Sequence, residues 1–165
     1  MAEMFLQLEK IDGESLDSTH HDKIEIKSWA WNTKNTVKWD VNQGGQSTRV
    51  VIEHIEIKKT CDKASPILHQ CCVTGRHIKS GKIICRKNDG DSKFEYMILE
   101  LTDIMLNMFN WSGNGDEQSI EETVGLSFAE YKISYKLQGD TGTAQGSSEF
   151  KFNVQRQTGQ GMQGA

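Results

Sequence analysis

Proline is nearly absent from this chain, which has one proline among its 165 residues. That residue, Pro66, lies between Ser65 and Gly75. Proline fits the first turn of a helix because its missing N–H would have no partner there, a serine can cap the same turn, and a glycine suits the left-handed stop. The pattern therefore predicts one short helix over residues 65–75, capped by Ser65, in a chain that otherwise reads as extended or looped.

Metal-binding cysteine patterns are also absent. The four cysteines are Cys61, Cys71, Cys72 and Cys85, and no two of them form a C-x2-C pair. Cys71 and Cys72 are neighbours on the predicted helix, where their side chains point about 100° apart, so they are poorly placed to bind one ion together. We expect reduced thiols and no metal, with Leu68, Cys71 and Cys72 forming the apolar stripe of the helix.

The chain lacks long apolar runs and basic stripes. No uncharged run approaches the roughly 20 residues of a membrane-spanning helix, and the first residues show no basic start followed by an apolar run. The net charge is −4, with basic and acidic residues interspersed, so no surface is suited to a run of phosphates. We expect no membrane insertion, no nucleic-acid partner and no signal peptide, and therefore a protein made in the cytoplasm.

Catalytic motifs are missing as well. The sequence has no G-x-S-x-G elbow and no H-E-x-x-H pattern. Residues 75–82 look like a phosphate-binding loop, but the spacing is one residue too long and Ile83 stands where a hydroxyl is needed. His20 and His21 lie in a charged loop, which is typical of solvent-facing histidines. We therefore predict no catalytic residues and no cofactor, and a protein that assembles or binds rather than one that turns over a substrate.

What the sequence does contain is a regular series of apolar and β-branched alternations. They predict strands over residues 4–9, 23–31, 49–59, 82–86, 94–102, 104–111, 122–137 and 149–154. Such spacing with one helix indicates a mainly β fold, an antiparallel β-barrel or sandwich of about eight strands with one short α-helix packed on its side. We expect one domain over residues 1–154 and a disordered polar tail over residues 155–165.

Several predicted strands carry apolar residues on both faces. Ile24 and Ile26 have one parity, whereas Trp29 and Trp31 in the same strand have the other. Either a bulge shifts the register or both faces are buried, and we favour partial burial of both faces because the same two-sidedness recurs over residues 94–111. The outer sheet of a monomer should be apolar on one side only, so a second apolar face indicates a partner chain. Edge strands without proline fit a closed ring of such chains.

The longest polar stretch, residues 32–48, contains the apolar residues Val37 and Trp39 and ends in Gly44-Gly45. Loops beyond about 12 to 15 residues are uncommon unless they are functional or disordered. A flexible insertion and a docking surface both fit the composition. A tryptophan such as Trp39 in a stretch of this kind favours the docking surface.

Two segments give the chain its most specific pattern. Residues 13–31 read G-E-S-L-D-S-T-H-H-D-K-I-E-I-K-S-W-A-W, and residues 62–78 read D-K-A-S-P-I-L-H-Q-C-C-V-T-G-R-H-I. Residues 94–101, the S-G-N-G at 112–115 and the L-S-F-A at 126–129 follow in order. With these segments the sequence resembles, over nearly its whole length, the Hcp proteins, the tube subunits of bacterial type VI secretion systems.

The resemblance implies a mechanical function with no turnover and no cofactor. It implies a β-barrel-like domain that forms a homohexameric ring whose strands line a wide pore. The rings would stack into a tube inside a contractile sheath, be expelled with a spike protein at the tip, and carry effector proteins in the lumen. The expected partners are therefore further copies of the chain, the spike, the sheath and secreted effectors. The expected localisation is cytoplasmic and then extracellular, by export through the secretion system without a signal peptide.

The resemblance also suggests where subunits meet. Residues 32–48 match the extended loop that reaches neighbouring subunits or the next ring in the family. We therefore predict Val37 and Trp39 as contacts between subunits or rings, together with Trp29 and Trp31.

Residues 112–115 match a segment near the lumen in the family, so Ser112 and Asn114 are predicted effector contacts. Two other functions stay open from the residues alone: a monomeric β-sandwich that binds a carbohydrate or peptide, and an enzyme. The two-faced strands favour the ring subunit over both.

Overall fold

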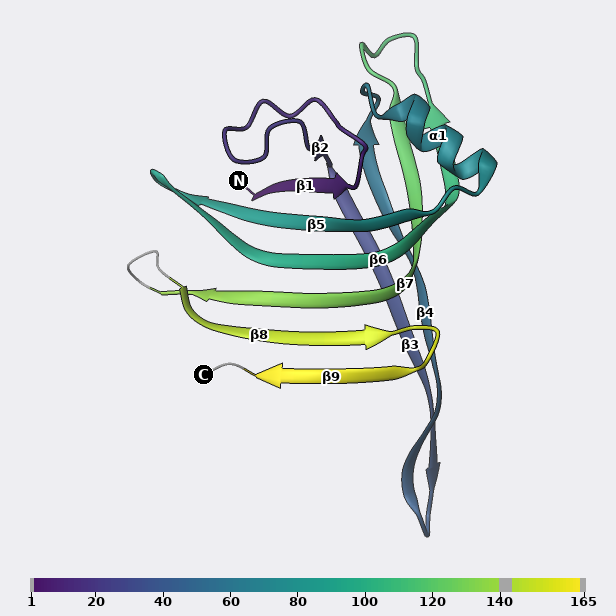
Figure 1. Ribbon diagram of the computed structural model, residues 1–165. Coiled ribbons are helices and arrows are strands. Elements are labelled where there is room, and N and C mark those ends of the chain that lie inside the picture. The colour runs from purple at the N-terminus through teal and green to yellow at the C-terminus, as the bar shows by residue number, and fades with distance from the viewer. Residues whose placement is uncertain (1, 140–143, 164–165) are drawn as a thin grey trace.

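The computed structural model describes residues 2–139 and 144–163, and these residues form one antiparallel sheet with one helix (Figure 1). The elements in chain order are β1 (Ala2–Leu8), β2 (Ile24–Glu25), β3 (Ser28–Asp40), β4 (Gly44–Thr60), α1 (Ser65–Thr74), β5 (Ile78–Asp89), β6 (Ser92–Ser112), β7 (Glu121–Gln138), β8 (Ala144–Asn153) and β9 (Thr158–Gln163). The predicted fold class, mainly β and antiparallel with one short helix, is confirmed.

The sheet forks at β7. The main strand order is β2-β1-β5-β6-β7-β4-β3, while β8 pairs with β7 and β9 pairs with β8. One edge of β7 is shared: its residues 121–126 pair with β4, and its residues 130–138 pair with β8. Two arms therefore leave the same strand, the β3–β4 hairpin and a β8–β9 wing, and Figure 1 shows them running in different directions.

The chain itself closes the other side of the sheet. β2 pairs with β1, whereas β3 pairs with β4. The change of partner falls between these strands, where the Ile26 N–H donates to the Met4 carbonyl (3.1 Å) and the Lys27 N–H donates to the Lys58 carbonyl (2.8 Å). The segment thus joins the β1 edge to the β4 edge, and the strands wrap around one core as the walls of a barrel.

This change of partner explains the two parities of residues 23–31. Ile24 and Ile26 are buried, and Trp29 and Trp31 are half-buried against the same core. The irregular backbone between β2 and β3 rotates the side chains, so both parities reach one core. Burial of both faces, which we favoured, is wrong for this segment, and the register shift is right.

A shift in the parity of the buried side chains also occurs in β6. The structure merges the two predicted strands of residues 94–111 into one, within which Asp103 has a φ of 53°. Leu99 and Leu101 are buried before this residue, and Ile104 and Leu106 are buried after it. The positive φ at Asp103 shifts the parity, so part of the apparent two-sidedness of this strand comes from a single face.

The core lies inside the barrel and under the helix. It comprises Leu6, Leu8, Ile11, Ile24, Ile26, Ile55, Ile57, Ala64, Leu68, Cys71, Ile78, Ile83, Cys85, Leu99, Leu101, Ile104, Leu106, Val124, Leu126, Phe128 and Tyr131. α1 packs on β6 through Leu68 and Cys71, which are fully buried, whereas Cys72 is half-buried at the side of the stripe.

The predicted helix is correct apart from its cap. Ala64 occupies the N-cap position, and the Ser65 hydroxyl instead accepts from the Asp62 N–H (2.9 Å). Asp62 in turn accepts from the Ala64 N–H (3.0 Å), so the side chains of Asp62 and Ser65 hold the turn before the helix, and the N-cap lies one residue earlier than predicted. Gly75 ends the helix with a φ of 66°, as the sequence indicated.

Residues 32–48 are not a loop. They continue β3 and begin β4, with Trp39 opposite Gly45 and Asp40 opposite Gly44. Cross-strand hydrogen bonds satisfy the backbone of a segment whose side chains nearly all face solvent, which the polar composition alone could not indicate. The hairpin projects beyond the barrel in Figure 1.

The predicted disordered tail is replaced in part by β9, which pairs with β8 from Asn153↔Thr158 to Ser148↔Gln163. Strand pairing uses backbone groups, so a polar, glycine-rich sequence with few side chains to bury can still add to a free edge. Residues 164 and 165 of the tail lie outside the described part of the chain.

Candidate assembly surfaces

The end of the β3–β4 hairpin exposes apolar side chains. Val37 is 49% exposed, Trp39 82% and Val41 99%, and we call these three residues the hairpin tip. A Cβ atom on Gly45 would lie 2.7 Å from the Trp39 ring, so only a glycine at this position of β4 leaves room for the indole. The hairpin tip is therefore a preformed apolar surface that the described residues of the chain leave uncovered.

Trp29 and Trp31 lie at the base of the same hairpin but have different surroundings. The Trp31 indole donates to the Glu53 carbonyl (2.9 Å), and its ring meets those of Phe128 and Tyr131 edge-on at centroid distances of 5.7 and 4.7 Å. Trp29 also packs on the core. These two tryptophans fix the hairpin to the barrel, so the structure separates them from Val37 and Trp39, with which the sequence grouped them.

Ser112 and Asn114 lie at the end of the molecule opposite the hairpin tip. Ser112 is the last residue of β6, and Asn114 belongs to the β6–β7 loop, where its side chain accepts from the Asp116 N–H (3.2 Å) and its carbonyl accepts from the Glu117 N–H (3.1 Å). Both residues are exposed. Figure 1 shows this loop beside α1, far from the hairpin tip, so the two predicted sets of contacts occupy two different surfaces.

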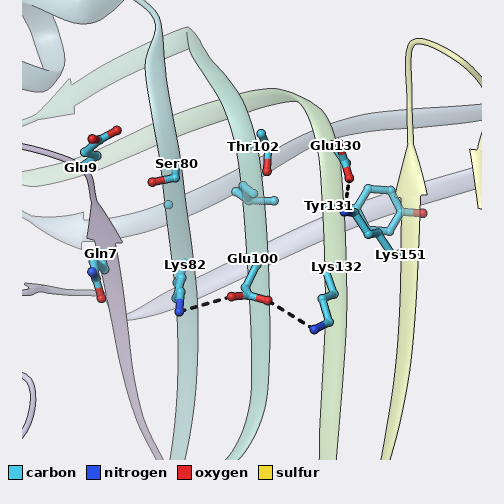
Figure 2. Close-up of a pocket in the computed structure, with 12 residues that line it drawn as sticks. Gln7, Glu9, Ser80, Lys82, Glu100, Thr102, Glu130, Tyr131, Lys132 and Lys151 are labelled. Atoms are coloured by element: carbon cyan, nitrogen blue, oxygen red, sulfur yellow. Dashed lines mark ion pairs between the residues drawn. The ribbon is translucent and has the colours of Figure 1, made fainter. Parts of the chain in front are cut away.

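A charged face crosses β5 to β8, and the sequence reasoning missed it. Figure 2 shows Glu100 between Lys82 (3.2 Å) and Lys132 (3.9 Å), and all three residues line a cavity of about 350 Å³. Lys132 also contacts Glu149 (3.4 Å), and Lys151 contacts Glu130 (2.7 Å).

Each lysine on this face is therefore paired with a glutamate on a neighbouring strand, which makes a solvent-exposed and nearly neutral surface. The sequence held a partial sign of such a face, because Glu130 and Lys132 stand two positions apart in β7, as do Glu149 and Lys151 in β8. No sequence pattern told which strands would be neighbours.

The opposite face of β7 and β8 is apolar and incompletely covered. Tyr135 is 42% exposed, Leu137 54% and Phe150 39%, and Phe152 is half-buried beside them. A groove of about 680 Å³ runs between this apolar wing face and the β3–β4 arm, bordered by Tyr131, Phe150, Phe152, Val50, Ile52 and Arg49 among others. It is a second apolar surface that the monomer leaves open to solvent.

A buried ion network lies under the start of α1. The Lys59 ammonium, fully buried, donates to Glu122 (2.7 Å), Asp62 (3.0 Å) and the Ser65 hydroxyl (3.3 Å). The Trp111 indole donates to the other Glu122 oxygen (2.6 Å). Burial raises the pKa of Glu122, but the donors Lys59, Ser65 and Trp111 outweigh it and hold the pKa below its ordinary value.

A second ion network anchors the loop between β1 and β2. The Arg86 guanidinium, also buried, donates to both carboxylate oxygens of Asp17 (3.0 and 2.6 Å) and to Glu3 (2.9 Å). Arg86 first, and then Lys93, hold the pKa of Asp17 far below its ordinary value. Both networks hold elements of the barrel together, and the first also fixes the half-exposed Trp111 ring through Glu122.

The described residues offer little for catalysis. Within residues 2–139 and 144–163, no group of three or more His, Cys, Asp or Glu side chains could hold a metal ion, and no helix there has the length and apolarity to cross a membrane. His20, which the sequence placed in solvent, is buried, contacts Glu95 (2.7 Å) and lies against the Phe5 ring. The surfaces left over are apolar or evenly charged, which fits contacts with other proteins.

The described residues thus form a barrel with one docked helix, with buried charges in structural networks and with exposed apolar surfaces. A family model described as "Type VI secretion system effector, Hcp" matches residues 5–135. The chain therefore belongs to the Hcp family of type VI secretion proteins, and its role is structural and not enzymatic.

Individual relatives agree with the family. "Protein hcp1" of Pseudomonas aeruginosa is 28% identical over 155 residues, which cover 93% of this chain and 96% of that protein. The crystal structure of Hcp1 from Salmonella typhimurium has a TM-score of 0.80 at 29% identity, covering 96% of this chain and 99% of that one. A structure described as a type six secretion system protein has a TM-score of 0.90 at 24% identity, covers 97% and 100% of the two chains, and supports the fold.

Proposed function

We propose that this chain is the tube subunit of a type VI secretion system, which forms homohexameric rings that stack into an expelled tube and carry effectors in the lumen. Family membership supports a secreted type VI protein. The exposed apolar surfaces support assembly beyond family membership. The hairpin tip and the apolar face of β7 and β8 leave large side chains in water, and a second copy of the chain would cover them. The partners that follow are further copies, the spike, the sheath and effectors.

Subunit contacts belong to this proposal. Val37 and Trp39, at the exposed hairpin tip, are proposed to contact a neighbouring subunit or the next ring. Trp29 and Trp31, each half-buried, are proposed to contribute through their remaining exposed edges. Ser112 and Asn114 are proposed effector contacts. Export would follow synthesis in the cytoplasm and would use the secretion machine.

Analytical ultracentrifugation at micromolar concentration, together with electron micrographs of the purified protein, tests the assembly. The expected result is a hexamer seen as rings with a central hole. A monodisperse monomer at that concentration would contradict the proposal and favour the alternative, a monomeric β-sandwich that binds a ligand.

A further inference from the structure

Three aromatic rings form a surface at the end of the barrel where α1 lies, and we call His69, Phe109 and Trp111 the aromatic cluster. The His69 ring stacks on Trp111 with centroids 5.0 Å apart and planes inclined by 16°. Phe109 stands edge-on to both rings, at 5.3 Å from His69 and 5.0 Å from Trp111. Trp111 nevertheless remains 52% exposed, so the cluster is not a closed part of the core.

The aromatic cluster is held in place before any partner arrives. The Trp111 indole is bonded to Glu122, which is itself paired with the buried Lys59. Beside it, Ile120 is 46% exposed, and its carbonyl accepts from the Cys61 N–H (2.8 Å), which ties the β6–β7 loop to the chain entering α1. A surface with fixed rings loses little conformational entropy on binding, which favours its use as a docking site.

The aromatic cluster and the hairpin tip lie at opposite ends of the molecule (Figure 1). The hairpin tip therefore cannot cover the aromatic cluster of its own chain. Two different apolar surfaces at opposite ends make a head-to-tail contact possible, and repeating such a contact builds an open stack.

Charge favours the same pairing. Residues 32–48 carry Lys34, Lys38 and Asp40, whereas residues 112–120, beside the aromatic cluster, carry Asp116 and Glu117 and no lysine or arginine. Lys38 is exposed, and an ammonium group gains from lying over an indole face as well as from a nearby carboxylate. The arrangement would place a lysine and a tryptophan from one copy against a tryptophan and two carboxylates from the next.

We propose that the aromatic cluster, with the acidic β6–β7 loop beside it, receives the hairpin tip of a second copy in the next ring. This inference rests on the proposed tube function and adds the receiving surface to it. It also places Ser112 and Asn114 next to the contact between rings. A position in this contact is an alternative to the effector contact that was predicted for these two residues.

Photo-crosslinking locates the receiving surface. Val41, which is 99% exposed, is replaced by the photoreactive p-benzoylphenylalanine, rings are assembled and irradiated, and the crosslinked peptides are identified by mass spectrometry. The expected products join residue 41 of one chain to residues 65–74 or 109–120 of another. Crosslinks elsewhere, or stacked rings without crosslinks, would overturn the inference and leave the tube proposal standing. Failure of the unmodified protein to form rings would overturn the tube proposal itself.

A charge exchange provides the second test. Lys38→Glu and Glu117→Lys are each expected to raise the concentration at which rings stack by about tenfold, because a small loss per contact is repeated around the ring. The double variant should return to within about threefold of the parent, and hexamers should persist in all three by sedimentation. Lys136→Glu, on β7 away from both ends, is the control for the change in charge. Equal losses in the double and single variants would count against the pairing.

Discussion

The barrel end under α1 and the hairpin tip use tryptophan in opposite ways. Trp111 at the barrel end is bonded to Glu122 and stacked on His69, within reach of the buried Lys59 network. Trp39 at the hairpin tip is 82% exposed and lies over a glycine. At the barrel end, hydrogen bonds and ring contacts fix the tryptophan to buried charged residues, whereas at the hairpin tip the tryptophan ring lies mostly in solvent. Changes in the buried Lys59–Glu122 pair at the barrel end should therefore act on stability, and changes in the hairpin tip should act on assembly.

The largest effect is expected from Lys59→Ala. The substitution would leave the Glu122 carboxylate buried without its cation, which costs about 4 kcal/mol of unfolding free energy. Denaturant unfolding measures this loss, and Lys63→Ala, at an exposed lysine four residues on in the same segment, should cost under about 0.5 kcal/mol. Similar small losses in both variants would show that the network does not stabilise the barrel end.

A smaller effect is expected when the second network is titrated. Because Arg86 and Lys93 depress the folded pKa of Asp17, its contribution is fully present above the unfolded pKa of about 4 and is lost as pH falls toward the depressed folded value. Stability should therefore fall between pH 5 and pH 2. Asp17→Asn should lower stability at pH 7 by about 2 kcal/mol and flatten this pH dependence. Denaturant unfolding at several pH values checks both, and an unchanged slope in the variant would assign the acid sensitivity to other carboxylates.

The smallest effect on stability is expected from Trp39→Ala. Unfolding free energy should change by less than about 0.5 kcal/mol because the side chain is mostly in water, while sedimentation should show weakened ring stacking or neighbour contact. Trp31→Ala is the matched tryptophan control. Its ring packs on Phe128 and Tyr131, so it should lose about 2 kcal/mol of stability. A melting temperature that drops in Trp39→Ala as it does in Trp31→Ala would place Trp39 in the core.

The sequence predicted those elements whose information is local. Pro66 and Gly75 marked the helix to within a residue, because backbone preferences of single residues decide where a helix begins and ends. Its cap was placed one residue late, since Ser65 bonds back to Asp62 in a turn that several residues build together. The apolar alternation predicted the strands and the fold class. It also suggested that β6 has two apolar faces, whereas a shift in parity at Asp103 turns both sets of apolar side chains toward a single core.

The candidate surfaces could be predicted only in part. Val37 and Trp39 stood out because apolar residues in a polar stretch have no local reason to be there, and both proved exposed. Trp29 and Trp31 looked equivalent to them and are instead packed at the base of the hairpin, because β4 and β7 supply neighbours that no spacing in the sequence reveals. Their proposed subunit contacts and those of Ser112 and Asn114 stay predictions.

By itself, then, the sequence determined the helix, the strand-rich fold class, the family resemblance and the presence of unexplained apolar residues, all of which depend on residues close together in the chain. The tertiary structure alone decided that residues 32–48 form a hairpin, that Lys59 and Glu122 share a buried site, and that the aromatic cluster lies opposite the hairpin tip. Those features depend on which distant strands become neighbours. Such pairing is set by burial and cross-strand hydrogen bonds in the whole sheet, and not by the preference of any one segment.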